Sequence, residues 1–233
     1  MFPIPSIRHF RAFTVREQDL FQEFWKLFSE KNAQVNLSAI RDEQGFWEKH
    51  IYDSLLGAPI IAEKAPKNII DMGSGGGFPA IPLAILFPDI LFTPVDSVQK
   101  KGKAIQDFAN ALGLTNVVVR CGRAEDLGRE KQMREKYDMI LARAFAKFSP
   151  LLEMTLPFLR QKGTLLAYRG PDNDAHDEAL IDYFGGFCTQ KHQGVLPSGE
   201  AREIWEIIKV EPTSSQFPRK VGIPKLEPIG VED

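Results

Sequence analysis

The sequence predicts an α/β protein with a mostly parallel, seven-stranded sheet, an N-terminal helical extension and an antiparallel C-terminal hairpin. Three observations carry this prediction. Short apolar runs typical of strands alternate with helix-like segments between residues 68 and 184. Before them, apolar side chains recur at helical spacing. After them, two strand-like runs flank the turn Pro197-Ser198-Gly199. Alternating strands and helices are typical of parallel sheets, and the hairpin adds an antiparallel edge.

Residues 1–66 are expected to form the helical extension. Thr14 and Glu17 have the spacing of a capping box, so a helix should begin just after Thr14. The apolar residues that follow it recur on one helical face. A second helix is expected over about residues 43–63, because its apolar positions have the same period.

Residues 67–211 are expected to form the core, and 212–233 a proline-rich tail that packs on it. Short apolar runs predict strands at 68–71, 90–96, 116–120, 137–142 and 164–167. The helices are expected at 79–87, 99–112, 149–160 and 175–184. The hairpin strands are expected at 187–196 and 201–210.

The composition excludes several classes of protein. The chain has 233 residues, 43% of them hydrophobic and 26% charged, which excludes disordered, collagen-like and coiled-coil chains. No signal peptide or membrane-spanning stretch is recognisable, so we expect a cytoplasmic protein without a membrane partner. Cys121 and Cys188 lie far apart and no Cys/His cluster accompanies them, so we expect reduced thiols and no metal site.

The sharpest motif is a glycine-rich loop, Asp71-Met-Gly73-Ser-Gly75-Gly-Gly77, between an expected strand and an expected helix. Glycines let the backbone adopt left-handed dihedrals and approach a ligand closely. Asp96 ends the next strand, where a carboxylate can accept hydrogen bonds from both hydroxyls of a ribose. Glu125 follows the third strand, where an adenine amino group would then lie.

Two cofactors fit this frame. The spacing Gly75-x-Gly77-x-x-Ala80 satisfies a dinucleotide fingerprint, which would make the protein an NAD-dependent oxidoreductase. An S-adenosylmethionine site instead requires an acid two residues before the first glycine, and Asp71 is at that position. Its carboxylate suits the methionine end of that ligand and would repel a pyrophosphate. The motif therefore favours S-adenosylmethionine over NAD, and a turn without any ligand least of all.

The charges are distributed unevenly. The net charge is −2, yet residues 97–169 hold 14 Lys and Arg against 7 Asp and Glu. A basic zone beside a methyl-donor site suggests a polyanionic substrate. The alternative is a set of solvated helix faces, which we favour for residues 129–136 because acids are interleaved there. The candidate phosphate-binding residues are Lys100, Lys101, Arg123, Lys147, Arg219 and Lys220. The last two could instead anchor the tail.

The segment after the fourth strand, Ala142-Arg143-Ala144-Phe145-Ala146, restricts the chemistry. It lacks the Asn/Asp-Pro-Pro-aromatic motif used to methylate exocyclic amines, and it has no cysteine to attack a pyrimidine ring. Guanine N7 needs neither, because it already carries an in-plane lone pair; orientation and desolvation could suffice. Arg143 is the candidate catalytic residue, able to orient a carboxylate, a phosphate or guanine O6.

Several longer motifs resemble the RsmG (GidB) family of bacterial 16S rRNA guanine-N7 methyltransferases over nearly the whole chain. The matching stretches are Asn36–Ile40, Glu48–Leu55, Asp71–Pro82, Asp96–Lys101, Gly122–Glu125, Ala142–Ala144 and Phe217–Pro224. Ala80 replaces the usual glycine, and Val98 replaces a common leucine or asparagine. Neither departure removes a polar ligand contact.

The resemblance implies a class I (Rossmann-like) methyltransferase fold and methyl transfer from S-adenosylmethionine to N7 of one guanine in the decoding region of 16S rRNA. We further expect a monomer that acts on 16S rRNA in the small ribosomal subunit or its precursor. The cofactor-binding residues from motif and resemblance together are Asp71, Gly73, Gly75, Gly77, Phe78, Asp96, Ser97, Val98, Ala124, Glu125 and Arg143. A non-catalytic RNA-binding module on the same fold remains an alternative.

His50 and Asp53 are three residues apart, so on a helix they would share a face. They could contact RNA or the active site. The interpretation we favour is a pair that clamps the helical extension to the sheet.

Overall fold

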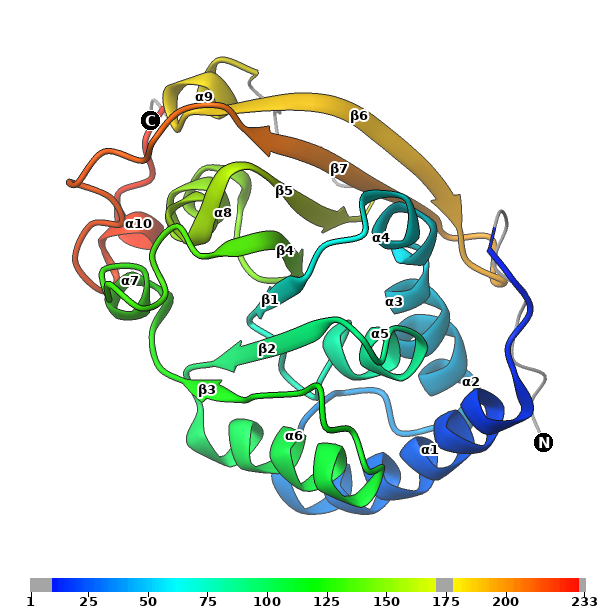
Figure 1. Cartoon of the computed structure of the whole chain (residues 1–233). Helices are drawn as coiled ribbons and strands as arrows, with labels where there is room; N and C mark the ends of the chain where they lie inside the picture. The colour runs from blue at the N-terminus through cyan, green and yellow to red at the C-terminus, as the bar shows by residue number, and fades with distance from the viewer. Residues whose placement is uncertain (1–9, 171–177, 231–233) are drawn as a thin grey trace.

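A computed structural model describes residues 10–170 and 178–230. Their strands form one seven-stranded sheet with the order β3-β2-β1-β4-β5-β7-β6 (Figure 1). The strands are β1 (Asn68–Met72), β2 (Leu91–Asp96), β3 (Arg120–Cys121), β4 (Tyr137–Arg143), β5 (Leu159–Arg169), β6 (Gly186–Val195) and β7 (Ala201–Lys209).

The pairing of the strands confirms the predicted sheet. The first five strands pair in parallel, with Asp71 opposite Pro94 of β2 and Leu141 of β4. β7 is antiparallel to both of its neighbours, β5 and β6. The last strand of the chain therefore lies between β5 and β6, and β6 forms the edge of the sheet.

Helices cover both faces of this sheet. Those of the extension are α1 (Val15–Val35), α2 (Glu43–Gly45), the π-helical η1 (Phe46–Tyr52), α3 (Asp53–Leu55) and α4 (Ala58–Lys64). Those of the core and tail are α5 (Ala80–Leu86), α6 (Gln99–Ala111), α7 (Ala124–Leu127), α8 (Phe148–Thr155), the 3₁₀ turn η2 (Leu156–Phe158), α9 (Glu178–Tyr183) and α10 (Ile223–Leu226). No helix in these described ranges is both long and apolar enough to cross a membrane.

The predicted capping box at the start of α1 is confirmed. The Thr14 hydroxyl accepts a hydrogen bond from the Glu17 backbone N–H at 3.2 Å, and the Glu17 carboxylate accepts one from the Thr14 N–H at 2.7 Å. Arg11 also donates to this carboxylate. Two otherwise unsatisfied N–H groups at the helix start are thereby satisfied, which fixes where α1 begins.

The second predicted helix is wrong as a continuous element, because it is divided into α2, η1, α3 and α4. The break before α4 lies where the chain comes close to β5. A Cβ atom at Gly57 would lie 2.2 Å from the Tyr168 hydroxyl, so a glycine is needed for the chain to pass β5 this closely. Pro59 then occupies the first turn of α4, where its missing N–H has no cost.

Three predicted boundaries also move. The predicted helix 149–160 already ends at Thr155, and β5 begins at Leu159 rather than at 164. Pro157 lies in the η2 turn between them, and proline cannot continue a helix. The third strand is reduced to Arg120–Cys121. The first residues of the predicted helix 175–184 lie outside the described part of the chain.

The two faces of the sheet bury different helices. Ile69 packs with α1, η1, α4, α5 and α6, whereas its neighbour Ile70 packs with α7, α8 and α9. Leu141 and Ile140 of β4 divide between the faces in the same way, as the two-residue period of a strand requires. Figure 1 shows α1, α5 and α6 on one side of the sheet and α7 and α8 on the other. The helical extension thus shares one core with the sheet.

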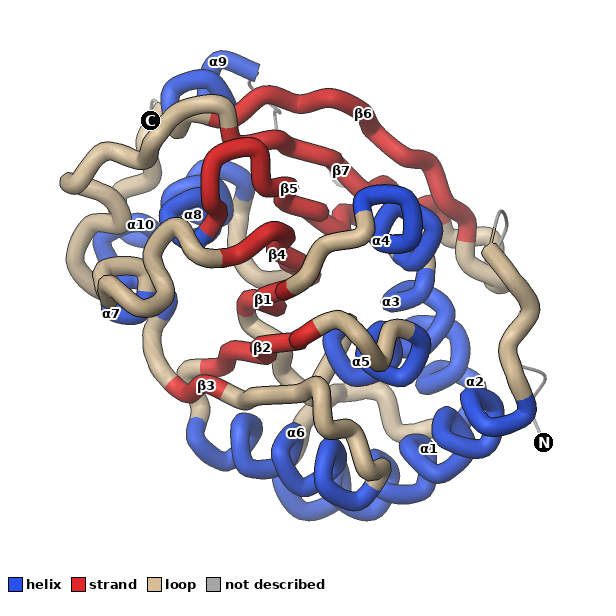
Figure 2. Tube along the Cα trace, in the orientation of Figure 1, coloured by secondary structure: helices blue, strands red, loops and turns tan. Residues whose placement is uncertain are grey.

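The segment after β7 lies on the second face. Arg134 donates hydrogen bonds to the carbonyl groups of Thr213, Ser214 and Phe217 at 2.7–3.0 Å. In Figure 2 this loop runs past α10 and α7. Part of the basic zone of the sequence therefore holds the tail in place instead of forming a solvated helix face.

Candidate functional site

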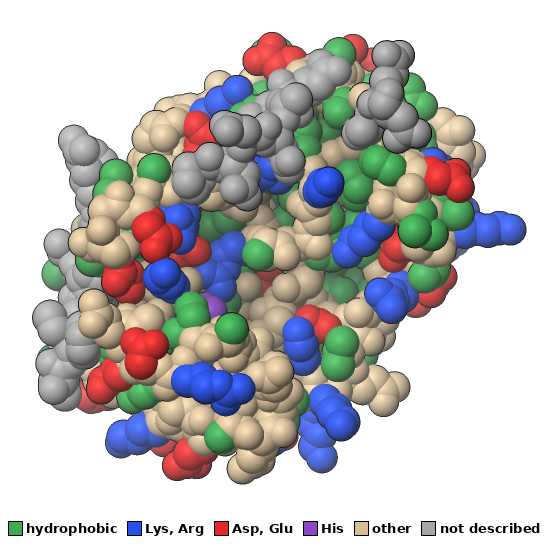
Figure 3. Space-filling view, turned by 180° about the vertical axis from the view of Figure 1, so that it is seen from behind, with side chains coloured by type: hydrophobic (Ala, Val, Ile, Leu, Met, Phe, Trp, Pro, Cys, Tyr) green, Lys and Arg blue, Asp and Glu red, His purple; other side chains and the backbone are tan. Residues whose placement is uncertain are grey.

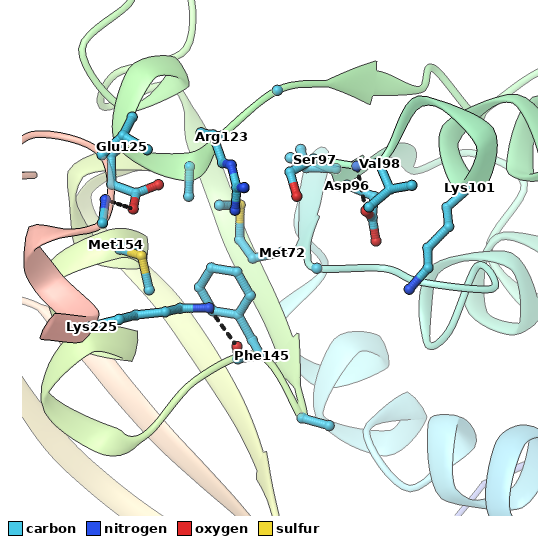
Figure 4. A pocket seen from close by; sticks show the side chains of 17 residues that line it. Met72, Asp96, Ser97, Val98, Lys101, Arg123, Glu125, Phe145, Met154 and Lys225 are labelled. Carbon is cyan, nitrogen blue, oxygen red and sulfur yellow. Dashed lines mark hydrogen bonds between the residues drawn. The ribbon is translucent and has the colours of Figure 1, made fainter. Parts of the chain in front are cut away.

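A first cavity of about 350 Å³ lies at the carboxyl ends of β1 to β4, the edge at which open α/β sheets bind ligands (Figure 4). Its walls come from the ends of these strands, the start of α6, α7, α8 and the tail. They are Met72, Gly73, Val95, Asp96, Ser97, Val98, Lys101, Gly122, Arg123, Ala124, Glu125, Ala144, Phe145, Met154, Val221, Gly222 and Lys225.

The glycine-rich loop forms the floor beside β1. Gly73, Gly75 and Gly77 have φ angles of 74°, 58° and 95°, which side chains rarely adopt. The loop N–H groups are used internally: those of Gly73 and Ser74 donate to the Val95 carbonyl, both at 2.9 Å. Gly73 lines the first cavity, whereas Gly75 and Gly77 shape the turn behind it.

Asp96 is held rigidly at the end of β2. One carboxylate oxygen accepts the Gly75 N–H at 3.0 Å, and the other accepts the Val98 N–H at 2.8 Å. A carboxylate has about four acceptor positions, so two backbone donors leave it able to accept two more hydrogen bonds. Figure 4 shows this carboxylate pointing into the cavity. The geometry therefore suits a ligand with two neighbouring hydroxyl groups.

Glu125 lies across the cavity, in the first turn of α7. One of its oxygens accepts the Gly222 backbone N–H at 3.0 Å, which joins the tail to the cavity wall. Glu125 is buried, and its second oxygen remains available as an acceptor in the cavity. A carboxylate in this position can accept a hydrogen bond from an exocyclic amino group.

Asp71 lies behind the loop and is fully buried. One oxygen accepts the Ser74 hydroxyl at 2.5 Å and the Ala80 N–H at 3.2 Å. The other oxygen, Oδ1, has no hydrogen-bond partner within the described chain. Burial raises the pKa of Asp71 to about 7, against the lowering effect of those hydrogen bonds. A buried acceptor without a donor fits a ligand ammonium group or a bound water beside Gly73.

A second cavity of about 670 Å³ adjoins the first, and Ala144 and Phe145 line both. Its walls are His50, Asp53, Arg143, Ala144, Phe145, Ala146, Lys147, Leu151, Tyr168, Arg169, Gly170 and Arg202. Four of these side chains are cationic and one is a carboxylate. The second cavity is therefore basic, whereas the first has both signs of charge: the carboxylates of Asp96 and Glu125, and the cations Lys101, Arg123 and Lys225.

Arg143 joins the extension to the sheet from within the second cavity. Its guanidinium donates to the Asp53 carboxylate at 2.7 Å and to the Lys49 carbonyl at 2.7 Å. Arg202 of β7 donates to the other oxygen of Asp53 at 3.1 Å. The carboxylate of Asp53 thus links the helical extension to arginines of two strands, β4 and β7, which agrees with the structural role that we favoured for Asp53.

His50 also lies between the helical extension and the sheet. Its ring stacks on Phe78 with centroids 4.2 Å apart, and its Nε2 lies 2.8 Å from the Ser38 hydroxyl. The other ring nitrogen, Nδ1, lies 3.3 Å from Arg143. Burial lowers the pKa of His50 to about 3, and the neighbouring Arg143 charge lowers it further. His50 is therefore neutral at neutral pH, with both ring nitrogens in contact with partners.

Six of the predicted cofactor-binding residues line the first cavity: Gly73, Asp96, Ser97, Val98, Ala124 and Glu125. Phe78 does not, because its ring is buried between α1 and η1. Arg143 lines the second cavity instead. Sequence alone could not separate these positions, because Phe78 directly follows the glycine loop and Arg143 directly precedes Ala144, which lines the first cavity.

The predicted phosphate-binding residues are divided among several places. Lys101 and Arg123 line the first cavity, and Lys147 lines the second. Lys100 and Lys220 are exposed.

The guanidinium of Arg219 is paired with the buried carboxylate of Glu153 at 2.8–3.2 Å. This pairing favours the second of its two predicted roles, an anchor of the tail, over a phosphate contact.

Sequence reasoning missed several residues that line the cavities. In the first they are Met72, Val95, Gly122, Phe145, Met154, Val221, Gly222 and Lys225, and in the second Arg202. Phe145 could have been predicted, because it lies just after the fourth strand, at the edge of the sheet where the ligand site was expected. Val221 and Gly222 belong to the stretch Phe217–Pro224 that resembles the family, but no motif there indicated that the tail lines a cavity. The described residues include no group of three His, Cys, Asp or Glu side chains that could hold a metal ion.

Solved methyltransferase structures have the same fold. An O-methyltransferase from Bacillus cereus in complex with SAH superposes with a TM-score of 0.55 at 18% identity, covering 85% of this chain and 92% of that one. A putative O-methyltransferase from Klebsiella pneumoniae gives a TM-score of 0.57 at 14% identity, with 85% and 92% covered. At this identity the likeness shows the fold alone, and it agrees with the class I fold that the sequence predicted.

Closer relatives are found by sequence. The family described as rRNA small subunit methyltransferase G matches residues 17–197. A ribosomal RNA small subunit methyltransferase G from Leuconostoc citreum is 38% identical, covering 93% of each chain. The protein of the same description from Nostoc punctiforme is 39% identical, covering 93% of this chain and 92% of its own. The chain therefore belongs to the rRNA small subunit methyltransferase G family.

Proposed function

We propose that this methyltransferase transfers a methyl group from S-adenosylmethionine to N7 of a specific guanine in the decoding region of 16S rRNA. The observation that carries the proposal is the first cavity, where Asp96 and Glu125 present acceptors on opposite walls. Asp71, whose Oδ1 has no hydrogen-bond partner among the described residues, lies behind the glycine loop. We expect the enzyme to act as a cytoplasmic monomer on the small subunit or its precursor.

The cofactor fits these residues from end to end. Asp96 would accept the ribose hydroxyls, Glu125 and the Ala124 backbone would frame the adenine, and Asp71 would receive the methionine ammonium directly or through water. When bound, S-adenosylmethionine supplies an electrophilic methyl group carried on a sulfonium. Gly73 has no side chain, which leaves room for the Phe145 ring against the glycine loop.

The loop fits a dinucleotide poorly. A pyrophosphate is bound by free N–H groups at such a loop and the helix behind it. Here the N–H groups of Gly75 and Ala80 are already bonded to the carboxylates of Asp96 and Asp71. Those carboxylates would also repel the ligand. The NAD-dependent alternative therefore has no support in this loop.

The second cavity is consistent with N7 as the acceptor atom. Attack by N7 needs no general base, because the lone pair lies in the ring plane and no proton has to leave. The carboxylate of Asp53 already accepts hydrogen bonds from Arg143 and Arg202, and both nitrogens of His50 are engaged. Neither group is free to remove a proton. Their task would be to hold Arg143 still, so that it can orient guanine O6 or a phosphate.

The proposal is tested with the purified full-length chain, radiolabelled S-adenosylmethionine and small subunits from cells that lack this protein. We expect one guanine in the decoding region to become sensitive to borohydride reduction and aniline cleavage, the signature of N7-methylguanine. Label in another base would refute the N7 assignment. Binding to the subunit without any transfer would favour the non-catalytic RNA-binding module instead.

A further inference from the structure

The short segment Ala144-Phe145 separates the two cavities and borders both of them. It directly follows Arg143, the last residue of β4. Ala144 is exposed and has a φ angle of 51°, a left-handed conformation that is unfavourable for a residue with a side chain. Such conformations persist only where the surroundings impose them, and they cluster at functional sites. This one determines the direction of the next side chain.

The ring of Phe145 is fixed in place between the cavities. It lies so close to Gly73 that a Cβ atom there would approach its Cδ2 to 2.6 Å. Lys225 of the tail lies with its ammonium 5.3 Å from the ring centroid, within the range of a cation–π contact. Figure 4 shows the ring projecting into the first cavity next to Met72. A half-buried aromatic face thus lies where the cofactor cavity opens into the basic one.

The carboxylate of the second cavity is already engaged. Asp53 pairs with Arg143 and Arg202, so it does not serve as the counter-charge of Lys147, which lines the same cavity. Lys147 forms no ion pair with any described residue and is exposed. Seen from behind, blue Lys and Arg side chains gather around a hollow in the surface, with acidic ones among them (Figure 3). A surplus of cations in a cavity favours phosphodiester groups.

We propose that Phe145 is the stacking platform for the nucleobase that receives the methyl group, and that Lys147 binds a phosphate flanking it. The inference rests on the proposed function and adds to it how the substrate is held. Proteins that read unpaired RNA stack the splayed base on an aromatic side chain. Stacking on Phe145 would place the base over the boundary with the cofactor cavity, while Lys147 holds the backbone outside.

The test compares Phe145→Leu, which keeps apolar bulk against Gly73, with Phe145→Tyr, which keeps the aromatic face. Methyl transfer to small subunits is measured under single-turnover conditions, with S-adenosylhomocysteine affinity and melting temperature measured alongside. We expect Phe145→Tyr to stay within about twofold of wild type. Phe145→Leu should lose about 5- to 100-fold in kcat/KM for the subunit, the range measured for loss of one stacked base.

Several results would overturn the stacking role of Phe145. An equally active Phe145→Leu, or equal losses in both variants, would overturn the inference. So would a loss in Phe145→Leu matched by an equal loss of S-adenosylhomocysteine affinity, because Phe145 would then be only a wall of the cofactor cavity. Absence of transfer by the wild type would instead contradict the proposed function. A second test uses the wild-type protein. Ultraviolet irradiation of its complex with the subunit should cross-link Phe145 to a base, and cross-links found only at other residues would contradict the stacking role.

The phosphate contact is tested separately through its salt dependence. Lys147→Met should reduce the slope of log affinity for the subunit against log salt by about 0.7–0.9, one phosphate contact. Lys131→Met removes the same charge from an exposed position outside both cavities and is the matched control. Equal slopes for the two variants would overturn this part of the inference.

Discussion

The ion pair between Arg219 and Glu153 gives the clearest prediction, because the sequence left two roles open for Arg219 and the structure favours one of them. The guanidinium Nε lies 3.0 and 3.2 Å from the two carboxylate oxygens, and a second nitrogen lies 2.8 Å from one of them. The backbone N–H of Arg219 also donates to Glu153, at 2.8 Å. Truncation to Arg219→Ala keeps only this last bond and leaves a buried carboxylate without its counter-charge.

The size of the effect follows from the burial of the acid. Glu153 has a side-chain exposure of 0%, whereas Arg219 is 25% exposed. Breaking a fully buried pair costs about 3–5 kcal/mol. Water can reach the pair from the Arg219 side, so we expect about 3 kcal/mol for Arg219→Ala. For a chain of this length that corresponds to a fall in Tm of about 6–12 °C.

The tail continues from Arg219 to Val221 and Gly222, which line the first cavity. A loosened tail should therefore weaken S-adenosylhomocysteine binding as well, and calorimetry measures both effects. Lys220→Ala is the matched control, because that neighbouring side chain is exposed and forms no ion pair with the described residues. If Arg219→Ala left Tm unchanged but reduced the salt slope of subunit binding, Arg219 would be a phosphate ligand and our structural reasoning would be wrong.

Three further changes have defined outcomes. Asp53→Asn should lower the free energy of unfolding by about 2–4 kcal/mol, because two partly buried arginines lose their shared counter-charge; an unchanged denaturation midpoint would contradict this. In the unfolded protein His50 binds a proton below about pH 6.5, whereas in the folded protein its pKa is about 3, so the wild type loses stability as the pH falls between these values. His50→Gln removes this group, so its free energy of unfolding should fall less steeply with decreasing pH over the same range. Asp96→Asn should weaken S-adenosylhomocysteine binding by about 1–3 kcal/mol in calorimetry, and equal affinity would exclude a ribose contact.

The parts of the fold that depend on local signals could be predicted from the sequence. Buried strands such as β1 and β4 are short apolar runs, and β1 leads directly into the glycine loop. The acidic residue at the end of β2 follows from the same pattern, because parallel strands end at one edge. Asp96 and Glu125 therefore could be assigned to a common site before their separation in space was known.

The remaining features depend on contacts between distant segments. Gly222 and Glu125 are 97 residues apart, and no pattern near either of them indicates that the tail closes the cavity. The second predicted helix breaks where Gly57 approaches Tyr168 of β5, a contact that the helical period cannot show. Phe78 is adjacent to the loop in sequence, yet its ring turns toward the extension because the aromatic cluster of α1 is there.

The basic residues between 97 and 169 fall into two groups: those that pair with other parts of the protein and those that remain available for a phosphate. Arg134 binds carbonyl groups of the tail, Arg143 is paired with Asp53, and Arg160 is paired with Asp138. A cation that already satisfies an internal acceptor contributes little to counterion release, because it cannot move to a phosphate without exposing that acceptor. Cations such as Lys147, which borders a cavity and pairs with no described residue, should therefore determine how subunit binding depends on salt. The charge count of the sequence indicates the class of the substrate, and the internal pairing determines which residues can bind it.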